Sequence, residues 1–167
     1  TRKRSSAASD VYKRQRWGTP IQVMMAIMKH ESSYREHVRP PRRKLLGFIP
    51  WTRGSSAYGY AQAQDSTWDW YRRDSGNRIA DRDDFDDAID FIGWYTHKSQ
   101  QCCGISKWNT RQQYFAYHDG HGGYKRGTYK KKKWLLNTAT RVENTASRYG
   151  AQLKSCEGDL DSGWWPF

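Results

Sequence analysis

The sequence lacks long hydrophobic runs, and no stretch approaches the roughly 18 apolar residues that a membrane-spanning helix needs. Acidic residues are also in short supply, because 17 Asp and Glu stand against 29 Lys and Arg, which gives a formal net charge of +12. Such a charge suits nucleic acid, an anionic membrane surface or a carboxylate-rich polymer, and by itself does not choose among them. A solvated basic surface explains the charge equally well.

Cysteine is scarce, with only Cys102, Cys103 and Cys156 in the chain. Adjacent cysteines rarely bridge each other, because disulfide geometry sets the two Cα atoms about 5.5 Å apart. A bridge from Cys156 to one of the pair stays open in an oxidising compartment, although we favour free or structural cysteines. Three cysteines at this spacing do not make a zinc site without histidine, so we expect no metal and no cofactor. Because no nucleic-acid-binding motif is present, we also expect no nucleic-acid partner.

The first 15 residues have no apolar periodicity, and the stretch SSAASDVYKRQ at 5–15 resembles a translated sequencing-adapter remnant. We therefore expect residues 1–15 to be a non-native, disordered remnant and leave them out of the fold prediction. The lack of a signal peptide then says nothing about the compartment. We expect one domain at 16–156, followed by a C-terminal tail at 157–167 that is extended.

The remaining chain reads as mainly helical. Apolar residues recur at helical spacing, and no strand pattern of any length appears. We predict a mainly α domain of about five or six helices, which include segments near 20–34, 66–74, 84–98, 110–117 and 129–154. A long basic segment at 35–58 contains three prolines and two glycines, so we expect an irregular loop that packs as a lip over a groove.

The first predicted helix carries a glutamate on its apolar side. Glu31 lies three and four residues after Met28 and Ile27, and it therefore points from the same face. Desolvation there raises the pKa of a carboxyl group, and an acid that is still protonated near neutral pH can protonate a glycosidic oxygen. The alternative is a glutamate at a helix end that reaches solvent.

Three short motifs follow in order: ESSY at 31–34, GYAQ at 59–62 and AYHDG at 116–120. Together they resemble the glutamate-serine, Gly-Leu-Met-Gln-like and Ala-Tyr-Asn segments of lytic transglycosylases with an SLT domain, which belong to the lysozyme-like superfamily. The resemblance covers residues 16 to about 154. It implies a lysozyme-like fold around a substrate groove, peptidoglycan as the substrate, and Glu31 as the catalytic residue.

The same resemblance assigns substrate contacts to Ser32, Gly59, Tyr60, Gln62, Tyr117 and His118. Gln62 offers a donor and an acceptor to the acetamido groups of the sugars, and Gly59 lets the backbone approach the groove. The Tyr117 hydroxyl is expected to orient Glu31, although a core tyrosine is an equal alternative. Ser32 can instead bond to its own helix backbone.

Two positions depart from the family pattern. Tyr60 and Ala61 replace Leu-Met, which changes the floor of the groove. His118 stands where the family has asparagine, so an imidazole either replaces the amide contact or leaves it out.

The resemblance implies that a single carboxylate cleaves the β-1,4 bond between MurNAc and GlcNAc and leaves a 1,6-anhydroMurNAc end. Most glycosidases instead use two carboxylates, about 5–9.5 Å apart. Asp65 and Asp119 are the candidates for a second carboxylate, as in a goose-type muramidase. However, Asp65 is well placed to cap the next helix and Asp119 to bond its own backbone in a glycine-rich turn. A non-catalytic cell-wall-binding module is the third interpretation.

A peptidoglycan substrate implies the periplasm or cell envelope, with a secretion or lipoprotein signal before this chain. A lipoprotein signal would also provide an anchor in the membrane. We expect a monomer.

Basic side chains around the groove would meet stem-peptide carboxylates. Four tryptophans are candidates to stack on sugars, and we expect at least two of them to be buried instead: Trp51, Trp68, Trp70 and Trp108.

Overall fold

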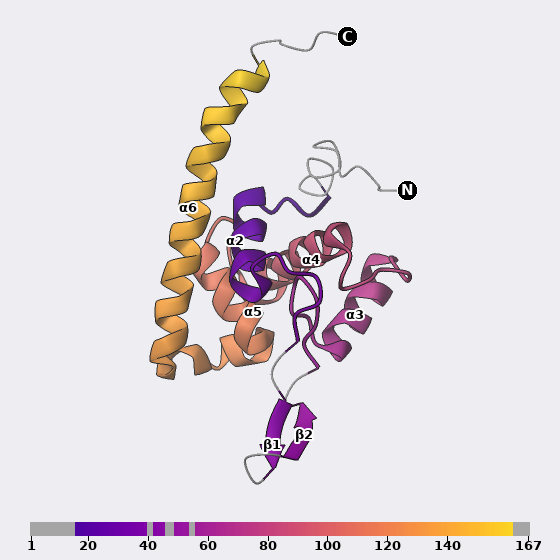
Figure 1. Cartoon of the computed structure of the whole chain (residues 1–167). Coiled ribbons are helices and arrows are strands. Elements are labelled where there is room, and N and C mark those ends of the chain that lie inside the picture. Colours follow the sequence, from indigo (N-terminus) through magenta and orange to yellow (C-terminus); the bar gives the residue numbers. More distant parts are fainter. Residues whose placement is uncertain (1–15, 40–41, 46–48, 54–55, 162–167) are drawn as a thin grey trace.

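The structure is a computed structural model that describes the backbone of residues 16–39, 42–45, 49–53 and 56–161, and the side chains of 16–39 and 56–156. Within these ranges the fold is mainly α, as predicted for a lysozyme-like domain (Figure 1). The helices are α2 (Ile21–Ser32), α3 (Asp65–Ser75), α4 (Phe85–Cys103), α5 (Thr110–Lys125), the 3-10 helix η1 (Thr128–Lys131) and α6 (Lys133–Asp161). The expectations for residues 1–15 and 162–167 lie outside the described residues.

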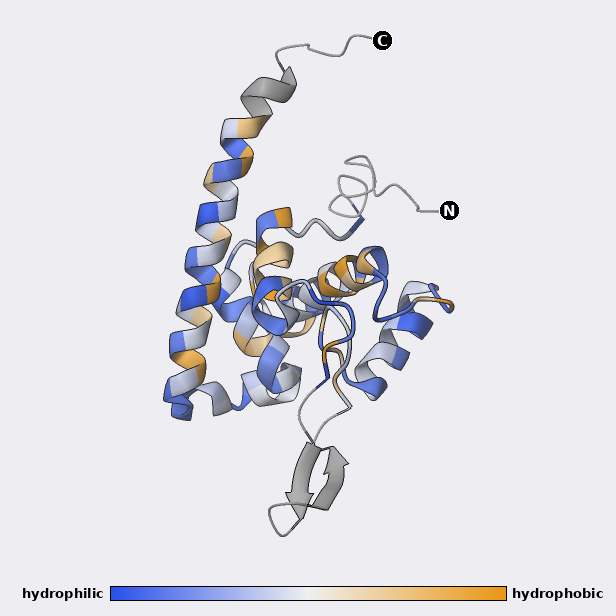
Figure 2. Ribbon diagram, in the orientation of Figure 1, coloured by the Kyte–Doolittle hydropathy of each residue, from blue (hydrophilic) through white to orange (hydrophobic). Residues whose placement is uncertain are grey.

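Helix α4 lies at the centre of the core. It begins at the cap residue Asp84, whose side chain accepts a 3.0 Å hydrogen bond from the backbone N–H of Asp87. Residues around its whole circumference are buried, with Phe91 and Trp94 among the largest enclosed side chains, which is typical of a helix covered on all sides. Figure 2 shows that α4 and α2 carry much of the apolar sequence, whereas α3 and α6 are mostly polar.

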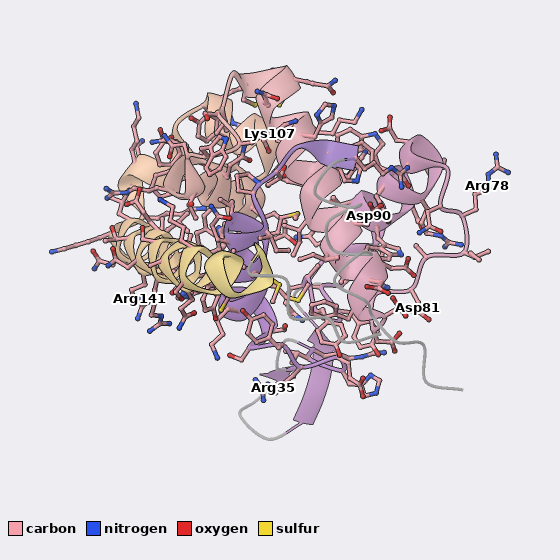
Figure 3. The ribbon with its side chains drawn as sticks, turned by 90° about the horizontal axis from the view of Figure 1, so that it is seen from above. Arg35, Arg78, Asp81, Asp90, Lys107 and Arg141 are labelled. Atoms are coloured by element: carbon pink, nitrogen blue, oxygen red, sulfur yellow. The ribbon has the colours of Figure 1, made fainter. Side chains whose placement is uncertain are left out.

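One carboxylate is buried inside this apolar helix. Asp90 accepts hydrogen bonds of 2.8 Å from the Tyr71 hydroxyl, 2.8 Å from Trp17 Nε1 and 3.3 Å from Arg16 Nη1. Because a buried charge is tolerated when it is paired and hydrogen-bonded, these contacts tie α3 and the segment before α2 to the centre of the fold. Figure 3 labels Asp90 among the packed helices.

Helix α2 has the apolar face that the sequence predicted, with Met24, Ile27 and Met28 fully buried. It ends two residues earlier than expected, because Ser33 and Tyr34 adopt left-handed φ values of 54° and 62°. The hydroxyl of Thr19, just before this helix, shares a buried hydrogen bond of 2.7 Å with the Thr96 hydroxyl. The end of α2 therefore turns sharply just after Glu31.

Helix α6 packs against α2 and α5 through an apolar stripe, in which Leu135, Ala139, Val142 and Ala146 are buried. It is separated from η1 by Lys132, and so the single helix expected from residue 129 is in fact two. It also continues to Asp161, which means that the extended tail was wrong for residues 157–161. In Figure 1 its C-terminal end extends beyond the other helices.

The loop expected at 35–58 contains a short hairpin. Strands β1 (Arg42–Leu45) and β2 (Ile49–Arg53) pair antiparallel, with Leu45 opposite Ile49. The sequence did not predict these strands, because the segment lacks the alternation of apolar and polar residues that marks a half-buried strand. Figure 1 shows the hairpin apart from the helices.

Candidate active site

A cleft of about 390 Å³ opens beside the end of α2, between the segment that precedes α3 and the kinked region of α5. The polar and aromatic residues that line it come from the helices α2, α3, α4 and α5 and from the segment before α3. They are Glu31, Gln62, Gln64, Thr67, Phe91, Tyr95, Tyr117, His118 and Asp119, together with Ala57, Ala63 and Gly120.

Glu31 is in the last turn of α2 and is half-buried in the wall of this cleft. Burial raises the pKa of its carboxyl group to about 7, and a hydrogen bond with the Tyr114 hydroxyl acts in the opposite direction. This agrees with the helix phase, which placed Glu31 on the same face as Ile27 and Met28. Near neutral pH a substantial fraction of this side chain therefore carries a proton.

Tyr114 is the partner of Glu31 that the sequence analysis missed. It is buried on α5, and its hydroxyl is the polar group that contacts the Glu31 carboxyl. Tyr114 precedes Tyr117 by three residues, so the two lie on the same side of α5. That spacing was the signal in the sequence that could have revealed it.

Tyr117 lines the cleft as predicted, but its hydroxyl does not donate to Glu31. It donates a 2.6 Å hydrogen bond to the backbone carbonyl of Ala61. Its ring packs against Tyr95 with ring centroids 5.1 Å apart. Tyr117 thus ties α5 to the GYAQ segment, and Tyr114 is the residue that holds Glu31.

Gln62 also lines the cleft, in a left-handed conformation with a φ of 49°. Its Nε2 donates hydrogen bonds of 2.9 Å to the Val38 carbonyl and 2.8 Å to the Gly59 carbonyl. Both amide protons are therefore committed to the protein, and only the side-chain oxygen can serve as the polar group for a ligand.

Three further residues from the motifs do not line the cleft: Ser32, Gly59 and Tyr60. The Ser32 hydroxyl donates back to the Met28 carbonyl at 3.4 Å, as in the alternative reading of this residue. Gly59 has a φ of 77°, and a Cβ there would lie 2.0 Å from the Arg82 carbonyl oxygen, so glycine is needed for packing against another loop. Tyr60 packs its ring edge-on against Phe85.

His118 lies at the mouth of the cleft beside a second carboxylate. Its Nδ1 donates to Asp119 at 2.9 Å, and its ring meets Trp134 edge-on with centroids 4.9 Å apart. Asp119 also accepts hydrogen bonds of 2.6 Å from Lys132 and 2.5 Å from the Thr128 hydroxyl. Burial alone would raise its pKa, yet these partners hold the pKa of Asp119 at about 2. Asp119 was expected to bond to its own backbone in a glycine-rich turn. In the structure its carboxylate is instead held by the side chains of Lys132, Thr128 and His118.

Asp65 is not part of the cleft. It forms a 2.7 Å ion pair with Arg82, and the cap position of α3 belongs to Gln64, which makes no side-chain capping bond. Of the tryptophans proposed to stack on sugars, Trp68 is buried, whereas Trp70 and Trp108 are exposed. The side chain of Trp51 lies outside the described residues. One of the three described tryptophans is therefore buried, and the expectation of at least two buried rings depends on Trp51.

Among the described residues, no three His, Cys, Asp or Glu side chains are grouped as metal ligands would be. The three cysteines are unpaired, with Cys102 and Cys156 exposed.

Chemically, the cleft combines two different carboxyl groups. That of Glu31 titrates near neutral pH, and that of Asp119 stays ionised.

Comparison with known proteins gives one match. The family model described as "Transglycosylase SLT domain" matches residues 2–156. This confirms the resemblance carried by the three motifs. No curated protein and no solved structure matched the sequence.

Proposed function

Because the chain belongs to the transglycosylase SLT domain family, we propose that it is a peptidoglycan lytic transglycosylase in which Glu31 is the single acid and base. The bond cleaved is the β-1,4 link between MurNAc and GlcNAc, and the product carries a 1,6-anhydroMurNAc end. The observation that carries this proposal is the Glu31 carboxyl, which faces the cleft with its pKa raised to about 7.

In the first step, protonated Glu31 gives its proton to the glycosidic oxygen, and the bond from that oxygen to C1 of MurNAc breaks. The N-acetyl group of the same sugar assists at C1. The Glu31 carboxylate then accepts the proton of the C6 hydroxyl while O6 bonds to C1, which restores the acid. No water is consumed, because the attacking hydroxyl belongs to the substrate and is already held close to C1.

A single carboxylate is supported by the state of Asp119. It is the other acidic side chain among the described residues that line the cleft, and Lys132, Thr128 and His118 occupy its oxygens. A carboxylate held by three donors at a pKa of about 2 is a poor general base for water and a poor nucleophile. The two-carboxylate mechanism of a muramidase therefore has less support.

We assign substrate contacts to Gln62, Tyr117 and His118, which line the cleft with Glu31. The Gln62 side-chain oxygen is directed to accept the N–H of an acetamido group, because its nitrogen is bonded to the backbone. His118 takes the place of the family asparagine at the mouth. The other three motif residues support the cleft from behind through their packing and do not touch the substrate: Ser32, Gly59 and Tyr60.

Peptidoglycan strands are accordingly the partner, and the periplasm or cell envelope is the site of action. We propose a monomer whose domain spans 16–156. Within the described residues, no helix is both long and apolar enough to cross a bilayer.

The test is mass spectrometry of purified peptidoglycan after digestion. A lytic transglycosylase releases fragments with 1,6-anhydroMurNAc ends, which are lighter by one water than the products of hydrolysis. Reducing MurNAc ends would instead identify a muramidase and end the single-carboxylate proposal. A non-catalytic cell-wall-binding module would release neither product. In that case the wild-type protein and the Glu31→Gln variant would bind peptidoglycan equally, and neither would cleave it.

A further inference from the structure

An exposed tryptophan lies next to the mouth of the cleft. Trp134, in the first turn of α6, is 55% exposed, and its ring meets that of His118, which lines the cleft. One side of the indole is therefore supported by the protein, and much of the rest faces water. The sequence analysis did not single out this residue.

The position of Trp134 relative to the cleft is fixed by charge. Lys132, two residues before it, is paired with Asp119 on α5 at 2.6 Å, and the Asp119 side chain is 1% exposed. Thr128 in η1 binds the same carboxylate at 2.5 Å. These contacts hold the start of α6 against α5. The Trp134 indole is therefore already positioned, and a ligand that binds it does not pay the entropy cost of ordering this segment.

A second hollow continues from Trp134 along α6. It is lined by Trp134, Asn137, Thr138, Thr140 and Arg141. Positions 134, 138 and 141 are four and three residues apart and share one side of the helix. Arg141 donates a 3.0 Å hydrogen bond to the Thr138 hydroxyl and remains exposed, extending from α6 into solvent in Figure 3.

This side of α6 borders the Glu31 end of α2. Burial and then the charge of Arg141 lower the pKa of His30, the residue before Glu31. Burial and the neighbouring Glu31 raise the pKa of Tyr114, and the charge of Arg141 opposes that rise. Helix α6 also contacts α2 directly, because His30 Nε2 lies 3.0 Å from the hydroxyl of Thr145, which is one turn after Arg141. This side of α6 therefore begins at the cleft, through the contact of Trp134 with His118, and continues toward the Glu31 end of α2.

We propose that the α6 face, defined as Trp134, Asn137, Thr138 and Arg141, is a second binding surface for the peptidoglycan strand outside the cleft. Trp134 stacks on the C–H face of a pyranose ring, and Asn137 and Thr138 offer polar groups to the sugar substituents. Arg141 pairs with a carboxylate of the stem peptide, which a guanidinium can bind with two hydrogen bonds. This inference rests on the proposed function, because it concerns the same substrate.

Binding is measured with Glu31→Gln protein, so that the substrate is not cut. The probes are purified intact peptidoglycan and glycan strands from which an amidase has removed the stem peptides. Trp134→Ala in this background is expected to weaken binding to both probes by about fivefold or more, as loss of a central aromatic contact does. Arg141→Gln should weaken binding to the intact polymer and leave binding to the stripped strands unchanged.

Trp108→Ala is the matched control, because Trp108 is 71% exposed and lines neither hollow. It should bind both probes as the parent does. Trp134→Phe keeps an aromatic ring next to His118 and should retain most of the binding, which guards against misfolding of the alanine variant. Thermal unfolding of each variant checks that the fold is intact.

Equal binding by the Trp134→Ala and Trp108→Ala proteins would overturn the proposal, and an Arg141→Gln effect on stripped strands would overturn the assignment of the peptide carboxylate. The proposed function fails separately, through the products of the wild-type digest. Reducing ends together with a Trp134 effect would remove the transglycosylase mechanism and keep the α6 face.

Discussion

Glu31 on α2 and Asp119 on α5 line the same cleft, yet their carboxyl groups differ in pKa by several units. Burial raises the pKa of Glu31 to about 7, and its one hydrogen-bond partner is the neutral Tyr114 hydroxyl. Burial acts in the same direction on Asp119, but Lys132, Thr128 and His118 hold its pKa at about 2. The difference in pKa comes from the hydrogen-bond donors around each carboxylate, and above all from the positive charge of Lys132 beside Asp119.

The comparison explains how one small cleft contains an acid and an inert carboxylate. A lysine within hydrogen-bond distance stabilises the ionised form, whereas a hydroxyl in a desolvated site compensates only part of the cost of the charge. Asp119 therefore serves to hold η1 and the start of α6 against α5 and to orient the His118 ring, while Glu31 is left able to exchange a proton.

The largest effect is expected from Glu31→Gln. The amide cannot donate an acidic proton, so release of fragments should fall by about 10²–10⁴-fold or below detection. The rate of muropeptide release from purified peptidoglycan measures this change. Binding should survive, because the substitution keeps the shape of the side chain, and retained cleavage would remove Glu31 from the mechanism.

The next effect is the pH dependence of cleavage. The acid must start protonated, and its pKa is about 7. The rate should therefore fall about tenfold for each pH unit above that value. Initial rates between pH 5 and 9 test this; a rate that is flat to pH 9 would mean that Glu31 is not the titrating acid.

Replacement of Asp119 should mainly affect stability. Asp119→Asn removes the ion pair with Lys132, and we expect the free energy of unfolding to fall by about 1–3 kcal/mol at neutral pH. Because the pKa of Asp119 is lowered from 3.8 to about 2, the wild-type advantage is full above pH 4 and is lost as the pH falls towards 2. Urea unfolding at pH 7 and pH 2 measures both values.

Cleavage by the Asp119→Asn protein distinguishes the two carboxylates. Its rate should stay far above that of Glu31→Gln, because the acid is intact. A loss as large as that of Glu31→Gln, with the fold preserved, would instead favour the two-carboxylate muramidase.

Glu31→Gln should also change stability, with the opposite sign. The folded protein holds a proton on Glu31 up to about pH 7, whereas the unfolded chain loses it near 4.5, so stability falls as the pH rises through this window. The neutral variant avoids this loss and should be about 1–3 kcal/mol more stable than wild type at pH 8, and equal to it at pH 4. A variant that is less stable than wild type at pH 8 would contradict a Glu31 pKa raised by folding.

The smallest effect is expected from Tyr114→Phe. The Tyr114 hydroxyl lowers the pKa of Glu31, so its removal should move the alkaline limb of the pH–rate profile to higher pH. Tyr117→Phe is the matched control, because that hydroxyl donates to the Ala61 carbonyl and not to Glu31. It should lower stability by about 0.5–1.5 kcal/mol and leave the pH profile in place.

Local patterns in the chain were enough to predict the helices and the face of α2 that carries Glu31. The stripes of α2 and α6 are periodic, and Asp84 and Gly76 stand where helices begin and end. The hairpin at 42–53 and the break at Lys132 were missed because neither has such a pattern. The extension of α6 past Lys154 was missed as well, since Gly158 in a polar stretch does not favour helix.

What the sequence by itself determined is the family, the mainly α fold and the direction in which Glu31 points, because these follow from motif order and helical spacing. Only the tertiary structure decided which residues share the cleft, since it brings α2, the GYAQ segment and α5 together. It showed that the partner of Glu31 is Tyr114 and not Tyr117. It also showed that Lys132 lies beside Asp119, although the two are 13 residues apart in the sequence. The protonation state of a carboxylate depends on such through-space neighbours, which spacing along the chain does not specify.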